Sequence, residues 1–66
     1  MVTIIKIRDV SRLTSLSKAT IYRQIKKGVF PIPLQLTERN VGWLTSEIEE
    51  WINQKAKNRR GNNLLN

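Results

Sequence analysis

Residues 16–30, LSKATIYRQIKKGVF, decide the fold of this chain because they predict a short helix with its own start signal. Ser17 is a favourable N-cap, since its hydroxyl can accept a hydrogen bond from a backbone N–H that otherwise has no partner. Leu16 and Ile21 flank this cap at the spacing of a hydrophobic staple. The start of the helix is therefore encoded within a few residues.

The same segment contains a stop signal. Gly28 can adopt the left-handed conformation that ends helices, and Pro31, which cannot continue one, follows shortly after. We therefore expect a helix over residues 18–27. Ile21 and Ile25 are four positions apart, so they form an apolar stripe that points to a core.

The rest of this helix surface is polar and basic. A short helix with a basic, hydrogen-bonding face fits the major groove of B-form DNA. The side chains that lie mainly away from the apolar stripe are Lys18, Thr20, Arg23, Gln24 and Lys27. The segment therefore predicts a function as well as a local structure.

Length and composition exclude several kinds of protein. The 66 residues suffice for one domain with one small core. Cysteine and histidine are absent, which excludes disulfides, thiolate metal sites and the commonest general base. No nucleophile–base pair or metal-ligand spacing is present, so we expect neither an enzyme nor a bound cofactor. No apolar run approaches the roughly 20 residues that cross a bilayer, and no signal-type N-terminus is present, so we expect a cytoplasmic protein.

The net charge of +7 is unevenly distributed along the chain. Residues 1–28 carry seven basic residues and one acid, whereas residues 29–54 carry one basic residue and four acids. Residues 55–66 are again basic, with four cations and no acid. Two basic blocks around an acidic centre predict one face that meets a polyanion, with nucleic acid first and an anionic membrane surface second.

A shorter helix is predicted upstream, over residues 8–14, because Ile7, Val10 and Leu13 repeat every three positions. Residues 2–7, VTIIKI, predict a short strand or an extended lead-in. A tight polar turn joins the two helices, and this arrangement is typical of a helix-turn-helix.

A β-hairpin is predicted after the second helix. Two prolines in residues 30–33, FPIP, exclude a helix there. Apolar and polar residues alternate over residues 34–36 and 41–43, with a polar tip over residues 37–40, and this alternation is typical of half-buried strands. An isolated hairpin is only marginally stable, so we expect it to pack on the helices as a wing.

A third helix is predicted near the C-terminus. Ser46 and Glu49 have the spacing of a capping box. Ile48, Trp51 and Ile52 follow with the period of an amphipathic helix, and the acids lie early and the bases late, as the helix dipole favours. Both tryptophans of the chain lie in phase with other apolar residues, so we expect core packing rather than base stacking.

The predicted fold class is mainly α with a small β-hairpin, in the order helix, turn, helix, hairpin, helix. The third helix is expected to run to about Lys57, so residues 1–57 form a winged helix-turn-helix domain and residues 58–66 a disordered basic tail. The expected core consists of large apolar residues, namely Ile7, Val10, Leu13, Leu16, Ile21, Ile25, Phe30, Leu34, Leu36, Val41, Trp43, Ile48, Trp51 and Ile52.

Four motifs agree, in order, with those of a known family. They are LT-x-LS over residues 13–17, TIYR over 20–23, K-x-G-x-FP-x-P over 26–33 and W-x-x-x-E-I-x-x-W over 43–51. In these motifs the chain resembles the AlpA family of phage-type transcriptional regulators. More distantly, it is similar to the winged helix-turn-helix of MerR regulators and phage excisionases. The resemblance covers roughly residues 5–52.

The resemblance implies a winged helix-turn-helix that binds double-stranded DNA and regulates a prophage or integrative element in the bacterial cytoplasm, at the nucleoid. The recognition helix, residues 18–27, would enter the major groove with the wing, residues 34–44, alongside. The wing tip, residues 38–40, departs from the family, in which Gly or Pro is more common. A single module has a small footprint, so tight binding is expected to need a homodimer or cooperative assembly on DNA.

Two other functions stay open at this point. One is an excisionase-like architectural factor that assists an integrase, whereas a regulator would act with RNA polymerase. The other is a non-enzymatic adaptor whose basic face binds an acidic protein surface.

Arg23 is the first candidate for base recognition, because arginine can donate two hydrogen bonds to O6 and N7 of guanine. Lys18 and Thr20 lie in the first turn, where base edges and phosphates both come within reach. Gln24 can pair with adenine, and Tyr22 can anchor a phosphate or pack at the domain edge. The complete predicted DNA-contact set is Ser17, Lys18, Thr20, Tyr22, Arg23, Gln24, Lys27 and Arg39. For each of them the alternative is a structural or solvated role.

Overall fold

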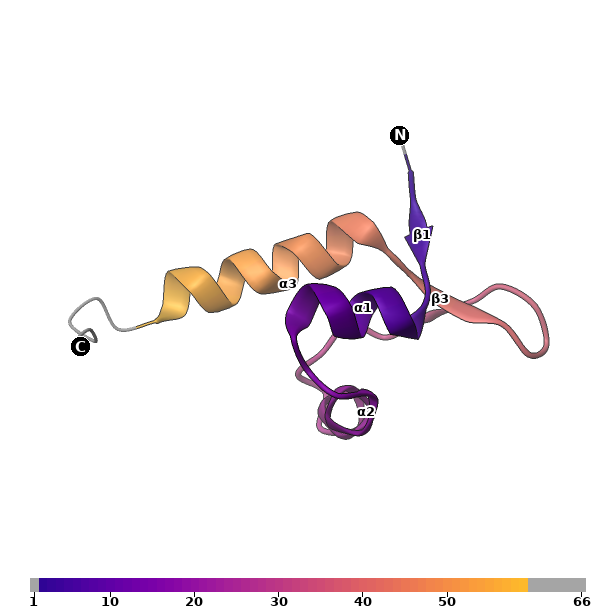
Figure 1. The fold of residues 1–66 in the computed structure, drawn as a ribbon, viewed down its shortest axis with the longest axis horizontal. Helices are drawn as coiled ribbons and strands as arrows, with labels where there is room; N and C mark the ends of the chain where they lie inside the picture. Colours follow the sequence, from indigo (N-terminus) through magenta and orange to yellow (C-terminus); the bar gives the residue numbers. More distant parts are fainter. Residues whose placement is uncertain (1, 60–66) are drawn as a thin grey trace.

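The structure is a computed structural model that describes residues 2–59 of the chain. It contains, in order, β1 (Ile4–Ile5), α1 (Ile7–Thr14), α2 (Lys18–Lys26), β2 (Leu34–Gln35), β3 (Val41–Leu44) and α3 (Thr45–Asn58). Figure 1 shows the hairpin projecting at one end of the molecule while α3 extends toward the other. Three helices with a small antiparallel sheet confirm the predicted fold class and are consistent with a winged helix-turn-helix.

The helix-turn-helix is held by local hydrogen bonds as well as by its core. Ser15 ends α1 in the left-handed conformation, with φ at 63°. The Thr14 hydroxyl donates to the Val10 carbonyl oxygen at 2.8 Å, and Thr14 Oγ1 accepts from the Leu16 N–H at 3.3 Å. The turn between α1 and α2 is therefore fixed at both ends.

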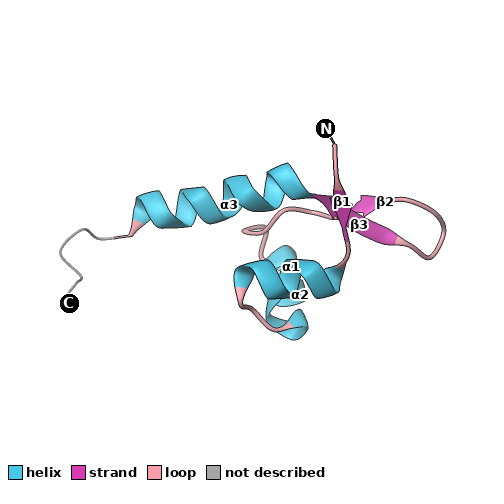
Figure 2. Cartoon of the chain, turned by 45° about the horizontal axis from the view of Figure 1, so that its top comes forward, coloured by secondary structure: helices cyan, strands magenta, loops and turns pink. Residues whose placement is uncertain are grey.

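The sheet has three strands, with β3 in the centre and β1 and β2 antiparallel on either side of it. Figure 2 shows the strands gathered at the end of the molecule opposite the C-terminal part of α3. The hairpin of β2 and β3 was predicted, and the extended lead-in proves to be the third strand. Gly42 lies at the crowded centre, because a Cβ atom there would be 2.7 Å from Ile4 Cγ2 and 3.0 Å from the Ile5 carbonyl oxygen.

The core draws one or two side chains from most elements. The five buried apolar residues are Val10, Ile21, Phe30, Trp43 and Ile48. Partly buried side chains pack around them, namely Ile5, Ile7, Leu16, Ile25, Trp51 and Ile52. Leu16 and Ile21, which are predicted to form a hydrophobic staple across the α2 cap, both belong to this packed group.

Both tryptophans anchor the segment that follows α2. The indole N–H of Trp43 donates to the Pro31 carbonyl oxygen, and that of Trp51 donates to the Val29 carbonyl oxygen, each at 2.9 Å. The ring of Phe30, between these two carbonyls, lies 4.8 Å from that of Trp51. The prediction that both tryptophans pack in the core is confirmed, and their hydrogen bonds tie the end of α2 to β3 and α3.

Three residues predicted for the core are exposed instead, namely Leu13, Leu34 and Leu36. Leu13 lies in the last turn of α1 and is 50% exposed. In the hairpin the strand register explains the error. Leu34 pairs with Gly42, so Leu34 and Leu36 share the outer face of the sheet while Trp43 points to the inner face.

The predicted capping box of α3 is also wrong. The helix begins at Thr45, directly after β3, and its N-cap residue, Leu44, makes no side-chain cap. The Thr3 carbonyl oxygen instead accepts hydrogen bonds from the Thr45 N–H at 2.9 Å and from the Thr45 hydroxyl at 3.1 Å. A contact with the N-terminal segment therefore starts α3. The helix continues to Asn58, and residues 60–66 of the predicted tail lie outside the described residues.

Candidate nucleic-acid interface

Helix α2 presents one apolar and one polar face, as its sequence predicts. Ile21 is fully buried and Ile25 packs against the core cluster. By the helical period, Arg23 points almost directly away from Ile21, and Lys26 lies beside it. The helix contains no acidic residue, so its outward face consists of cations and hydrogen-bonding groups.

The start of α2 is capped as predicted. The Ser17 hydroxyl oxygen accepts from the Thr20 N–H at 3.1 Å. The Ser17 hydroxyl in turn donates to Thr20 Oγ1 at 2.9 Å. Thr20 Oγ1 also accepts from Arg23 Nη2 at 3.1 Å. These contacts join Ser17, Thr20 and Arg23 into one hydrogen-bonded row along the exposed side of the first turns.

The end of α2 is set by Lys27 and Gly28. Lys27 is the C-cap residue, and its N–H donates to the Arg23 carbonyl oxygen at 3.0 Å. Gly28 has φ at 77°, the left-handed conformation predicted for the stop signal. The helix therefore ends within one residue of its predicted boundary, and the Lys27 side chain stays exposed.

All but one of the predicted contact residues lie on α2 or its caps. Lys18, Tyr22 and Arg23 are exposed, with Tyr22 47% accessible, while Thr20 and Gln24 are half-buried. The structure brings Ser17, Thr20 and Arg23 into contact. The remaining residue, Arg39, lies apart from this row, at the exposed tip of the wing between β2 and β3.

The wing tip is ordered by its own side chains. The Asn40 N–H and side-chain amide both donate to Thr37 Oγ1, at 3.2 and 3.0 Å. The Gln35 side-chain amide donates to the Thr37 carbonyl oxygen at 2.7 Å. The tip that carries Arg39 is therefore a structured turn, although it lacks the Gly or Pro common in the family that the chain resembles.

Lys6 is a candidate that the sequence did not indicate. It is exposed, and its ammonium group donates to Asn40 Oδ1 at 3.4 Å and to the Val41 carbonyl oxygen at 3.3 Å. It therefore places a second cation beside the end of the wing that carries Arg39. No local pattern could identify Lys6, because its position depends on the pairing of β1 with β3, about 40 residues further along the chain.

The cations of this surface form no ion pairs with other residues of the range 2–59. Among residues 2–59, the only ion pair joins Arg12 and Asp9 on α1, at 3.4 Å. Lys18, Arg23 and Lys27 on α2 therefore keep their charge available, and the N-terminal end of a helix adds a partial positive charge. The surface is chemically suited to an anion that also offers hydrogen-bond acceptors.

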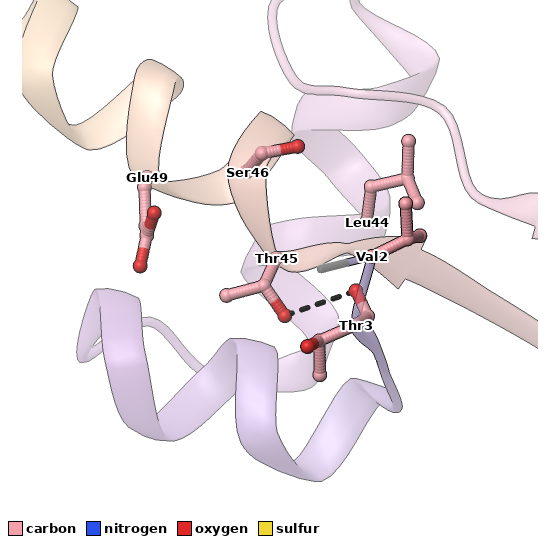
Figure 3. Close-up of a pocket in the computed structure, with 6 residues that line it drawn as sticks. All are labelled: Val2, Thr3, Leu44, Thr45, Ser46 and Glu49. Carbon is pink, nitrogen blue, oxygen red and sulfur yellow. Dashed lines mark hydrogen bonds between the residues drawn. The ribbon is translucent and has the colours of Figure 1, made fainter.

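A pocket of about 310 Å³ lies elsewhere, where β1, β3 and α3 meet. Figure 3 shows its lining, with the Thr45 hydroxyl bonded to Thr3 and Glu49 as the charged member. None of its residues belongs to α2, and the wing contributes to it only through Leu44, the last residue of β3. A lining with a carboxylate and no cation does not suit a nucleic-acid phosphate.

Within residues 2–59, no three His, Cys, Asp or Glu side chains gather closely enough to hold a metal ion. None of the helices described there combines the length and apolar character needed to cross a bilayer.

Comparisons with known proteins agree with the motifs of the sequence. The family described as Prophage CP4-57 regulatory protein (AlpA) matches residues 3–56, which include every element of the structure except the last two residues of α3. Uncharacterized protein ORF88 of Enterobacteria phage P4 is 38% identical over 56 residues, which cover 85% of this chain and 64% of that protein. The DNA-binding transcriptional activator AlpA of Escherichia coli K12 is 32% identical over 62 residues, covering 85% of this chain and 89% of that protein.

The family match spans most of the chain and includes both the helix-turn-helix and the wing. The chain spans a little under two thirds of the length of the phage relative. These matches confirm the resemblance drawn from the four motifs. This chain therefore belongs to the AlpA family of prophage regulatory proteins.

Proposed function

We propose that this protein is a sequence-specific, double-stranded-DNA-binding transcriptional regulator of prophage type. One observation carries the proposal. Helix α2 is fixed to the core through Ile21 and Ile25, while its outward face presents Arg23 and further donors without any acid on the helix. A rigid helix with a basic, donor-rich face matches the major groove, where base edges present acceptors.

The wing supports the same function. In winged helix-turn-helix proteins an ordered hairpin beside the recognition helix can contact the flanking backbone, and cations there add to the affinity. Arg39 supplies one cation at the tip of this hairpin, and Lys6 supplies a second beside Asn40 and Val41. The name of the E. coli relative, a DNA-binding transcriptional activator, supports a regulatory role. We place the protein at the bacterial nucleoid, with RNA polymerase as its partner and a second copy bound to adjacent DNA.

The experiment is a selection of bound fragments from bacterial genomic DNA at a stated salt concentration, followed by footprinting. The matched pair of variants is Arg23→Ala on α2 and Arg12→Ala on α1, because both remove one exposed arginine. We expect Arg23→Ala to abolish the preference for the selected site, and Arg12→Ala to retain it. Equal effects of the two substitutions would show that α2 does not recognise the bases.

The location of the footprint separates the regulator from its alternatives. A promoter operator supports transcriptional regulation. Tandem sites in an attachment region support instead an excisionase-like factor that acts with an integrase. Absence of any selected fragment, together with capture of an acidic protein domain, would support the adaptor.

A further inference from the structure

The hydroxyl of Thr20 stands between the helix cap and the outermost arginine of α2. It accepts hydrogen bonds from Ser17 Oγ at 2.9 Å and from Arg23 Nη2 at 3.1 Å. An oxygen of this type has two acceptor positions and one proton. Both acceptor positions of Thr20 are therefore occupied, and its proton is the part left to bind a partner.

This arrangement gives Arg23 a defined direction. A helical side chain tends to point back toward the N-terminus of its helix, and a residue three positions earlier lies on the same face. The bond to Thr20 uses this geometry and holds the guanidinium over the first turn of α2. Arg23 is otherwise exposed, and no carboxylate within residues 2–59 lies close enough to pair with it.

We propose that Thr20 is a positioning residue, whose hydroxyl oxygen aims the Arg23 guanidinium at one base that offers two adjacent acceptors in the major groove. This inference rests on the proposed function. Among the bases, guanine is the one with two adjacent acceptors on its major-groove edge, O6 and N7. The Ser17 proton is used on Thr20 Oγ1, so the donors that this row exposes are those of Thr20 and Arg23, and a base edge that presents an amino group to them is disfavoured.

The positioning role has a physical cause. A free arginine side chain samples many rotamers, and immobilising it at an interface costs free energy. The bond to Thr20 restricts those rotamers before DNA is bound. Loss of the bond should therefore reduce discrimination between bases more than it reduces binding to DNA in general.

The test uses the full chain and a library of random 30-base-pair duplexes at a fixed salt concentration. The selected duplex and a copy with its central G·C pair changed to A·T are then titrated with each protein. We expect a ratio of roughly 5- to 150-fold between the two dissociation constants for the unmodified protein, and a ratio near one for Arg23→Ala.

Thr20→Val keeps the branched shape but removes the acceptor. It should lower that ratio by roughly 2- to 12-fold, a larger factor than its loss of binding to unselected duplex. Thr20→Ser should restore the ratio. In the Arg23→Ala background, Thr20→Val should have no further effect on the ratio, because two residues that act as a unit are not additive.

The outcomes separate the two proposals. If Arg23→Ala removes the discrimination and Thr20→Val preserves it, the positioning role is wrong and the DNA-binding function stands. A uniform loss of affinity in Thr20→Val with an unchanged ratio would also overturn positioning, since it indicates a direct backbone contact. Failure of the unmodified protein to enrich any duplex would overturn the proposed function itself.

Discussion

Helices α2 and α3 begin in two different ways. The first turn of α2 is closed by Ser17, whose hydroxyl oxygen accepts from an N–H three residues later. The first turn of α3 has no side-chain cap and starts where β3 ends, with Thr45 bonded through its N–H and its hydroxyl to Thr3. One start depends on four consecutive residues, and the other on two segments 42 residues apart.

This difference matches the roles of the two helices. The outward face of α2 is exposed and carries the candidate DNA contacts, and the bonds that fix its first turn are made by residues of that face, without help from the rest of the chain. Helix α3 supplies core residues, and its position is set by the sheet. Substitutions at each start should therefore have separable effects on stability.

Gly42→Ala is expected to have the largest effect, because the added Cβ would meet Ile4 Cγ2 at 2.7 Å and the Ile5 backbone oxygen at 3.0 Å. Overpacking of this kind typically costs about 1–3 kcal/mol. For a domain of this size each kcal/mol lowers the melting temperature by roughly 4–8 °C. Circular dichroism during thermal unfolding measures the shift. The Ile4→Ala/Gly42→Ala double variant tests the cause, since it should lose less stability than the two single changes added together.

Ser17→Ala should cost about 1 kcal/mol, because it removes the acceptor for the Thr20 N–H. Ser17→Gly is the matched control, and it should cost only a few tenths of a kcal/mol relative to the unmodified protein. Urea unfolding followed by circular dichroism provides both values. Equal stability of the alanine variant and the unmodified protein would show that α2 does not depend on this cap.

Thr45→Val should cost about 0.5–1 kcal/mol, since it removes the hydroxyl bond to Thr3 and leaves the bond from the Thr45 N–H in place. Thr45→Ser keeps the hydroxyl and is expected to retain most of the stability. Native-state hydrogen exchange would locate the loss at β1 and the start of α3. If hydrogen exchange increased only at α2, the contact between Thr45 and Thr3 would not be what stabilises the start of α3.

Ser46→Ala is expected to have the smallest effect, within about 0.5 kcal/mol, because Ser46 is exposed and caps no helix. It is the direct counterpart of Ser17→Ala, and the two variants should be measured side by side. If Ser46→Ala also costs about 1 kcal/mol, α3 begins with the capping box that the sequence predicts, and the contrast between the two helix starts does not exist.

The candidate interface was largely predictable because its signals are local. The cap at Ser17, the stop at Gly28 and the opposed faces of α2 all involve residues a few positions apart. The direction of Arg23 was not predictable, because a side chain on an exposed face has several rotamers and its partner, Thr20, was itself assigned to DNA. Lys6 was missed because its place beside the wing requires the pairing of β1 with β3.

The hairpin, too, has one feature that the sequence predicts and one that it does not. Alternation correctly predicted two strands, but it placed Leu34 and Leu36 on the buried face. A change of register by one residue exchanges the two faces of a strand, and alternation alone does not fix the register. Gly42, which pairs with Leu34, leaves space on the outer face that the side chains of Ile4 and Leu36 fill, 2.7 and 3.3 Å from where its Cβ would lie.

The sequence by itself determined that this chain is a small basic helix-turn-helix with a wing, where α2 lies, which face of α2 is polar, and the family to which the chain belongs. Only the tertiary structure decided the third strand, the hairpin register, the start of α3 and the contact between Thr20 and Arg23. The reason is physical. Caps and helix periodicity act over about four residues, whereas strand pairing and side-chain orientation depend on packing between segments whose separation along the chain no local pattern encodes.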